Sequence, residues 1–206
     1  MGTSYETILV AADLDAVVRA VTATGAEAVV VPVADRRVAV VPREGDYDVA
    51  DVRPVAAAVS GQLRCPVLVS EVSDSDLVVC LVYRDGHRVH RYVSKVQMAV
   101  EWFEDDDGRF RAELDGEVLP DGAPVPQGPA GADPAAFAVF AADVADPDRI
   151  GVALRGEADP EDLVFAERHH ESIMRSLGLP TAALTVGYRH LAVDRFPGAM
   201  RITGRS

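Results

Sequence analysis

The sequence predicts an α+β protein, with a sheet in its N-terminal half and a helical C-terminal region packed on that sheet. Three patterns lead to this expectation. Apolar runs of strand length alternate with helical periodicity up to residue 73, two further strand-like runs meet at Asp85-Gly86, and helix start and stop signals dominate after Pro134. The chain has 206 residues, which is long enough to bury a substantial core.

Capping and turn signals place the first six elements. Asp13 stands where a helix N-cap would stand, and Gly25 follows the last helical position. Cys65-Pro66 ends a second helix. The expected elements are a strand at 7–11, a helix at 13–25, strands at 28–33 and 37–41, a helix from 51 and a strand from 66. This order is that of a split βαβ, or ferredoxin-like, unit, so both helices are expected on one face of the sheet.

Asp85-Gly86 is a two-residue signal for a tight hairpin that extends this sheet. The first strand of that hairpin is apolar on both faces, which predicts a place under cover on both sides. The expected pairs are Arg84 with His87, Val82 with Val89, Leu81 with His90, and Val79 with Tyr92. Strict alternation of side chains then places four polar or aromatic residues on the same face of the hairpin: Tyr83, Arg88, His90 and Tyr92.

The rest of the chain divides at a segment rich in Pro and Gly. Residues 96–102 and 109–114 are expected to be short strands around a turn at 105–108, and helices are predicted at 134–141, 147–154 and 159–177. The run 184–193 fits either a strand that returns to the sheet or a last helix. The predicted organisation is a sheet domain at 1–119, a linker or long loop at 120–134, and a mainly helical subdomain at 135–206.

Composition limits the partners of the protein. The net charge of −13 and the pI near 4.7 argue against nucleic acid and anionic membranes, since both need clustered Arg and Lys. A basic protein partner is compatible with this charge, although acidity also serves solubility alone. One Lys and no Asn are typical of proteins from high-GC bacteria. The sequence shows no secretory signal or apolar run of membrane length, and two isolated cysteines fit a reduced compartment, so a cytoplasmic protein is expected.

Two groups of residues are candidates for binding a ligand. The first group combines an imidazole, two phenols and a guanidinium, which could bind an anion or take part in proton transfer: Tyr83, Arg88, His90 and Tyr92. Cross-strand packing of aromatic and long side chains explains the same residues equally. On the last long helix, Glu167 and His170 are spaced i and i+3. The alternative for His170 is a histidine at the edge of the core.

The sequence holds no nucleophile elbow, phosphate loop or metal-ligand motif, and no cofactor or metal is predicted. Position 174, where a zinc protease signature needs its second histidine, is Met174. The prediction is a non-enzymatic interaction or regulatory protein, for example an accessory or immunity-type partner. The alternatives are a small-ligand-binding regulatory module, with its pocket between the sheet face of His90 and Tyr92 and the helix of Glu167 and His170, and an enzyme of unrecognised type with a His/Tyr/Glu site. Open sheet edges would also permit a dimer.

Overall fold

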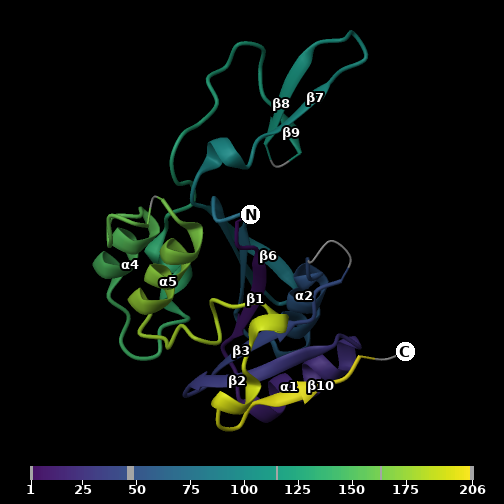
Figure 1. Cartoon of the computed structure of the whole chain (residues 1–206), viewed down its shortest axis with the longest axis vertical. Coiled ribbons are helices and arrows are strands. Elements are labelled where there is room, and N and C mark those ends of the chain that lie inside the picture. The colour runs from purple at the N-terminus through teal and green to yellow at the C-terminus, as the bar shows by residue number, and fades with distance from the viewer. Residues whose placement is uncertain (1, 46–48, 115, 163, 205–206) are drawn as a thin grey trace.

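The computed structural model describes residues 2–45, 49–114, 116–162 and 164–204. The protein is α+β, and its centre is a seven-stranded sheet in the order β10-β2-β3-β1-β4-β5-β6 (Figure 1). Every neighbouring pair in this sheet is antiparallel. Its strands are β1 (Tyr5–Val10), β2 (Ala28–Ala34), β3 (Arg37–Pro42), β4 (Val67–Ser73), β5 (Leu77–Arg84), β6 (His87–Val93) and β10 (Met200–Ile202).

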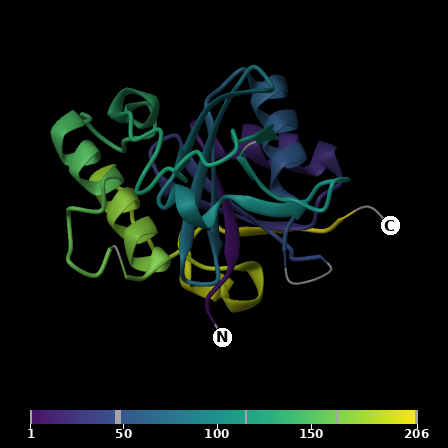
Figure 2. The same cartoon turned by 90° about the horizontal axis from the view of Figure 1, so that it is seen from above.

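Helices cover both faces of this sheet, which gives three layers (Figure 2). One face packs against α1 (Leu14–Thr24) and α2 (Val52–Leu63), as the sequence predicts. The other face packs against α3 (Pro134–Ala138), α4 (Pro147–Leu154) and α5 (Ala166–Ser176). Within the described ranges, no helix has the length and apolar character that a membrane span needs.

Alternate side chains of β5 belong to the apolar cores on the two faces of the sheet. Val78, Cys80 and Val82 belong to the core under α3–α5, whereas Leu81 and Tyr83 belong to the core under α1 and α2. A strand that is apolar on both faces leaves apolar surface in contact with water unless both faces are covered. The predicted place of this strand is therefore confirmed.

The predicted register of the β5–β6 hairpin is wrong by one residue beyond its first pairs. The turn itself forms as expected, with φ of 50° at Asp85 and 83° at Gly86, and Arg84 pairs with His87. Tyr83 then pairs with Arg88, but Val82 pairs with His90 and Cys80 with Tyr92. Val89, 54% exposed, is the extra residue of a β-bulge. Because one inserted residue reverses all later side chains, Tyr83 and Arg88 face α2, whereas His90 and Tyr92 face α3–α5.

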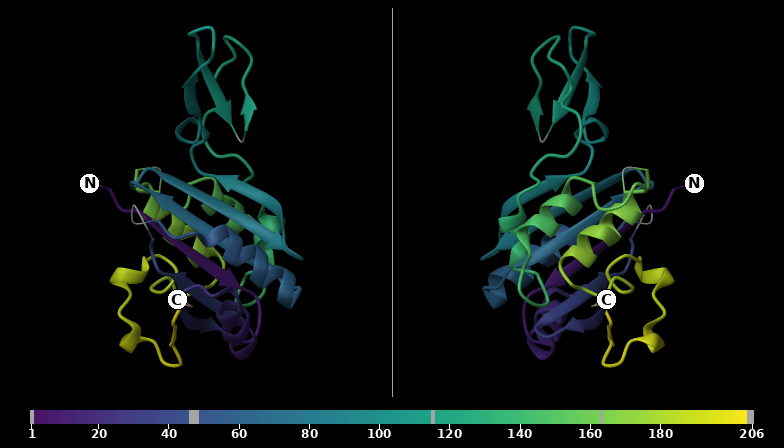
Figure 3. Two further views of the ribbon diagram at one scale, coloured as in Figure 1. Left: turned by 90° about the vertical axis from the view of Figure 1, so that its right-hand side faces the viewer. Right: turned by 90° about the vertical axis from the view of Figure 1, so that its left-hand side faces the viewer.

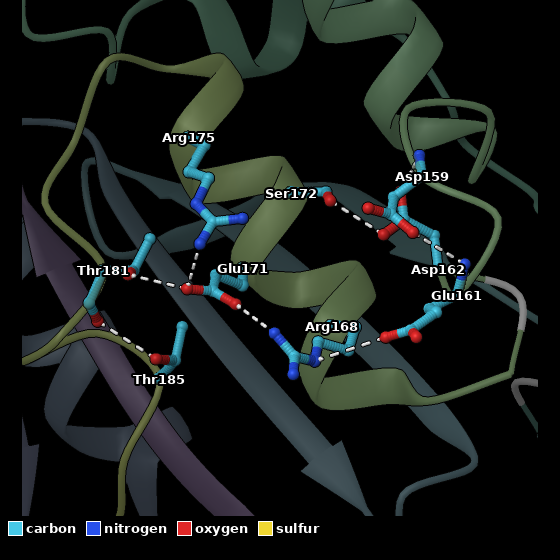
Figure 4. Close-up of polar contacts among 9 residues, drawn as sticks. All are labelled: Asp159, Glu161, Asp162, Arg168, Glu171, Ser172, Arg175, Thr181 and Thr185. Carbon is cyan, nitrogen blue, oxygen red and sulfur yellow. Dashed lines mark hydrogen bonds and ion pairs between the residues drawn. The ribbon is translucent and has the colours of Figure 1, made fainter.

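The last long helix is shorter than predicted, because α5 begins at Ala166 rather than near Asp159. The Asp159 carboxylate accepts a hydrogen bond from the Glu161 amide at 2.8 Å. The buried Asp162 carboxylate accepts from the Asp159 amide at 3.1 Å and from the Ser172 hydroxyl at 2.7 Å (Figure 4). These bonds hold a turn where the sequence favours a helix. The predicted helix also covers position 163, which lies outside the described residues.

The C-terminal run returns to the sheet later than the sequence suggests. The sequence of residues 184–193 fits either a strand or a helix. In the structure this run forms no strand and contains a short 3-10 helix, Tyr188–His190. A second such turn follows at Val193–Arg195, and β10 then pairs with β2 at the sheet edge. α3 is also shorter than predicted and ends at Ala138. The C-terminal helices and the sheet form one continuous apolar cluster, and the division into two subdomains stays a prediction.

Arg37 of β3 donates hydrogen bonds to the chain segment that follows α3. From β3, Arg37 Nε donates to the Phe140 carbonyl at 3.0 Å, and Nη2 donates to the carbonyls of Val139 at 3.1 Å and Ala141 at 2.8 Å. These carbonyls follow the last turn of α3, where a helix has no internal donors left.

We expect Arg37→Ala to lower the free energy of unfolding by about 2 kcal/mol, because it leaves partly buried carbonyls without a charged donor. The matched control is Arg36→Ala, whose guanidinium lies in solvent 3.7 Å from Asp13 and should contribute under about 0.5 kcal/mol. Urea denaturation measures both. Equal losses in the two variants would show that the α3 end is not held by Arg37.

A second, three-stranded sheet projects from the body, as Figure 3 shows from two sides. Its strands are β7 (Glu101–Glu104), β8 (Phe110–Leu114) and β9 (Glu117–Val118), reached through a short 3-10 helix at Val96–Met98. The predicted strands around a turn at 105–108 are thus present, although the first is confined to residues 101–104. We refer to residues 101–121 as the arm.

Candidate functional site

The six predicted binding residues lie in three separate surroundings. Tyr83 is buried under α2. Arg88 lines a pocket of about 310 Å³ between β6, α2 and the arm, together with Arg53, Arg91 and Glu113. Arg53 is held there by a bidentate ion pair with Glu71, in which Nε and Nη2 each donate at 2.8 Å. These residues are therefore separated from the other four by the thickness of the sheet.

His90 and Tyr92 lie on the opposite face, where both contact Phe137. Each ring lies 6.0 Å from the Phe137 ring in an edge-on arrangement. His90 Nε2 donates to the Gly131 carbonyl at 2.8 Å, since a carbonyl only accepts. The Tyr92 hydroxyl donates to the Leu154 carbonyl at 2.6 Å, and burial raises the pKa of this phenol. Both side chains hold α3 and α4 on the sheet, which is the packing alternative that the sequence allowed.

Glu167 and His170 bind different neighbours although they share a helix. His170 is fully buried, and its Nδ1 is hydrogen-bonded to the Tyr5 hydroxyl at 2.9 Å. Burial lowers the pKa of His170 to about 3, so the ring is neutral. Glu167 instead accepts from the Ser75 hydroxyl at 3.2 Å. A buried Tyr–His pair of this kind is a structural contact with no access for a substrate.

Sequence reasoning passed over His169, the neighbour of His170 in the chain. Its Nε2 donates to the Ala153 carbonyl at 2.9 Å and lies 3.2 Å from the Tyr92 hydroxyl. Among the described residues, no group of three or more His, Cys, Asp or Glu is arranged to hold a metal ion. The thiol of the buried Cys80 has its pKa raised to about 12 by burial, which disfavours the reactive thiolate.

Another hollow, of about 740 Å³, lies between the start of β1 and residues 185–190. Glu44 lines it, and this carboxylate accepts from the Arg189 amide at 3.4 Å. None of the six predicted residues lines this hollow.

The arm carries three exposed aromatic rings, two of which lie mostly in solvent, whereas the sequence predicts only short strands and a turn there. Trp102 is 61% exposed and Phe110 is 74% exposed. In the β7–β8 register Trp102 lies opposite Ala112 and Glu104 opposite Phe110. Residues opposite one another share a face, and every second residue returns to it, so both rings project from the same face of the arm.

Hydrogen bonds fix the turn that presents these rings. The Asp105 carboxylate accepts from the amides of Asp107 at 3.0 Å and Arg109 at 2.9 Å, and from Arg111 Nε at 2.9 Å. These donors, with Arg111 first, hold the pKa of Asp105 below its usual range. Arg111 also pairs with Asp121 at the other end of the arm. The aromatic face is thus carried by an ordered hairpin.

The arm also concentrates the negative charge of the protein. It contains nine Asp and Glu residues but only Arg109 and Arg111, so about a tenth of the chain carries a net −7 of the total −13. Arg111 is already occupied by two of these carboxylates. The remaining acidic groups create a negative potential around exposed aromatic rings, which attracts cationic and apolar groups together. The only signal of this in the sequence was the single Trp inside the most acidic segment.

We found no family model, curated protein or solved structure that matches the chain.

Proposed function

We propose that this protein is a non-enzymatic interaction protein, of the accessory or immunity type, that binds a basic protein partner through the arm. The observation that carries the proposal is the exposure of Trp102 and Phe110 on one face of a projecting, strongly acidic hairpin. Aromatic side chains of this size dominate the free energy of protein interfaces where they become buried.

Exposure of these rings has a physical cost that a partner would remove. Burial of apolar surface stabilises by about 25 cal/mol per Å², and a three-stranded sheet with short strands gains little from packing on itself. Trp102 and Phe110 lie outside both apolar cores of the protein. Exposed aromatic rings with a polar surround are typical of protein-binding surfaces.

The charge of the arm supports a basic partner rather than an acidic one. A net charge of −7 over 21 residues raises the rate of encounter with a cationic surface and repels anionic ones. The effect weakens with salt, because exposed charges are screened beyond about 10 Å at 0.1 M ionic strength.

We further propose that β1–α1–β2–β3–α2–β4 is a ferredoxin-like unit that serves as the scaffold. The antiparallel order β2-β3-β1-β4, with α1 and α2 on one face, supports this proposal. β5, β6 and the arm then extend one side of the unit. An experimental structure with the same four-strand order would bear it out, and a different pairing of β1 would contradict it.

The test is native mass spectrometry of the protein purified gently from cells that produce it naturally. We expect a stoichiometric basic protein with the wild type, and at least a tenfold loss of that partner in the double variant Trp102→Ala/Phe110→Ala. The matched control is Phe165→Ala, which removes an exposed ring away from the arm.

Retention of the partner by the double variant would contradict a role of the arm. A bound small molecule in place of any protein would favour the ligand-binding alternative instead.

A further inference from the structure

We propose that the partner binds the arm as an added β-strand alongside β7, through a segment of the pattern basic-apolar-apolar-basic. This inference rests on the proposed function of the arm and specifies the chemistry of its partner. It follows from the open edge of β7, the direction of the β7 amides and the order of its side chains.

Among the residues that the structure describes, no strand pairs with the outer edge of β7. β7 is the end strand of the sheet β7-β8-β9, and all four of its residues, Glu101–Glu104, are exposed (Figure 1). An end strand presents unpaired N–H and C=O groups, which is the arrangement that extended peptides use when they add a strand to a sheet. Proteins commonly protect such edges with charge, and the carboxylates of this arm exclude acidic segments while they admit basic ones.

The pairing with β8 identifies which amides of β7 point outward. The Asp105 amide donates to the Arg109 carbonyl at 2.9 Å, which makes these two residues a hydrogen-bonded pair. In an antiparallel ladder such pairs alternate, and the β7–β8 register runs from Glu104–Phe110 to Glu101–Glu113 without a shift. The N–H and C=O groups of Trp102 and Glu104 are therefore directed away from β8, toward the open edge.

The side chains of β7 define the incoming segment. Glu101 and Phe103 project from one face of the arm, and Trp102 and Glu104 from the other. The residues opposite this series would be basic, apolar, apolar and basic, because each carboxylate favours a cation and each ring favours an apolar neighbour. The pattern acidic-aromatic-aromatic-acidic of Glu101–Glu104 reads the same in both directions, so a parallel and an antiparallel segment need the same pattern.

A second copy of this chain is a poorer occupant of the same edge. Two arms side by side would bring two net charges of −7 together, and like charges directly opposite one another destabilise a strand pair. A basic segment gains from the same charges. We therefore assign the β7 edge to a basic segment of another protein.

The probe is the synthetic peptide acetyl-Gly-Arg-Val-Ile-Arg-Gly-amide, added to the full-length protein. Its first Arg and its Ile direct their backbone groups toward β7 in either orientation of the peptide, whereas Val directs them away. We expect the peptide to slow hydrogen exchange at the Trp102 and Glu104 amides, with no change at Phe103, whose amide already faces β8.

Two N-methylated peptides provide controls of equal charge that leave the protein unaltered. N-methylation at Ile should weaken binding about tenfold or more, because it removes a donor and obstructs the edge. N-methylation at Val should change the dissociation constant less than about threefold. If the two N-methylated peptides bind equally well, charge attraction alone explains the binding, and strand addition is overturned.

The outcomes separate this inference from the proposed function. If the natural partner depends on Trp102 and Phe110 but the peptide neither binds nor protects the two amides, strand addition fails and the interaction surface stands. If the partner is indifferent to these two rings, the proposed function itself fails. Protection of the same amides that increases with protein concentration, without peptide, would assign the edge to a second copy and overturn the inference.

Discussion

Replacement of Phe137 by alanine is expected to lower the free energy of unfolding by about 3–5 kcal/mol, the usual cost of deleting a buried phenyl ring. Phe137 has no exposed surface, and its ring lies 6.0 Å from those of both His90 and Tyr92. Because Phe137 belongs to α3 and the other two to β6, the substitution opens a cavity between the C-terminal helices and the sheet. Such a loss is a large part of the total stability of an ordinary domain.

The same substitution in the arm provides the control. Phe110→Ala removes a ring that is 74% exposed and should change stability by less than about 0.5 kcal/mol. Chemical denaturation measures both variants, and partner capture should give the reverse order, with binding lost in Phe110→Ala and kept by folded Phe137→Ala. A loss below about 1 kcal/mol in Phe137→Ala would mean that α3 is not part of the core.

Local signals in the sequence were sufficient for most helix and turn positions. Gly25 adopts a φ of 80° after α1, a left-handed value that favours glycine, and the predicted helix at 147–154 coincides with α4. The Asp146 carboxylate accepts from the amides of Asp148 and Arg149 there, so capping chemistry alone fixes the start. Such features depend on residues within one turn of each other, which a sequence displays directly.

The candidate site depended on a feature that no local pattern displays. Strict alternation placed Tyr83, Arg88, His90 and Tyr92 together, and the bulge at Val89 separates them into two pairs on opposite faces. Val89 is a strand-forming residue, and nothing in its type predicts that it lacks a partner on β5. With the bulge in place, the Tyr92 hydroxyl reaches the Leu154 carbonyl, a contact between distant parts of the chain that no local pattern displays.

The arm was missed for a related reason. Residues 96–102 contain enough apolar side chains for an ordinary buried strand, and whether Trp102 is buried depends on where the chain leads after Val96. The 3-10 turn at 96–98 directs the chain away from the body, so the same pattern ends in solvent (Figure 3). Periodicity predicts that a strand forms, but not whether another layer covers it.

The stability of the protein should decrease as pH falls from about 6.5 to 5, because of its buried histidines. Burial lowers the pKa of His170 to about 3 and that of His169 below its usual range, against about 6.5 in the unfolded chain. In this pH window the unfolded chain binds protons that the folded protein excludes, so protonation favours unfolding. Each such histidine contributes a slope of up to about 1.4 kcal/mol per pH unit.

Urea denaturation from pH 7 to 5 measures this slope. The buried Glu6, whose pKa is raised by desolvation, binds its proton more readily in the folded protein and so acts with the opposite sign, which is why the wild type and the variants are compared at the same pH values. We expect the double variant Tyr5→Phe/His170→Phe, which removes both partners of the 2.9 Å hydrogen bond, to lose the part of the slope due to His170 and to keep the part due to His169.

An unchanged slope in the double variant would mean that His170 takes up its proton in the folded state. The ring would then need a counter-charge. Glu167, on the same helix, has one buried oxygen without a hydrogen-bond partner among the described residues, as does His170 at Nε2. A reduced slope instead assigns His170 to the core.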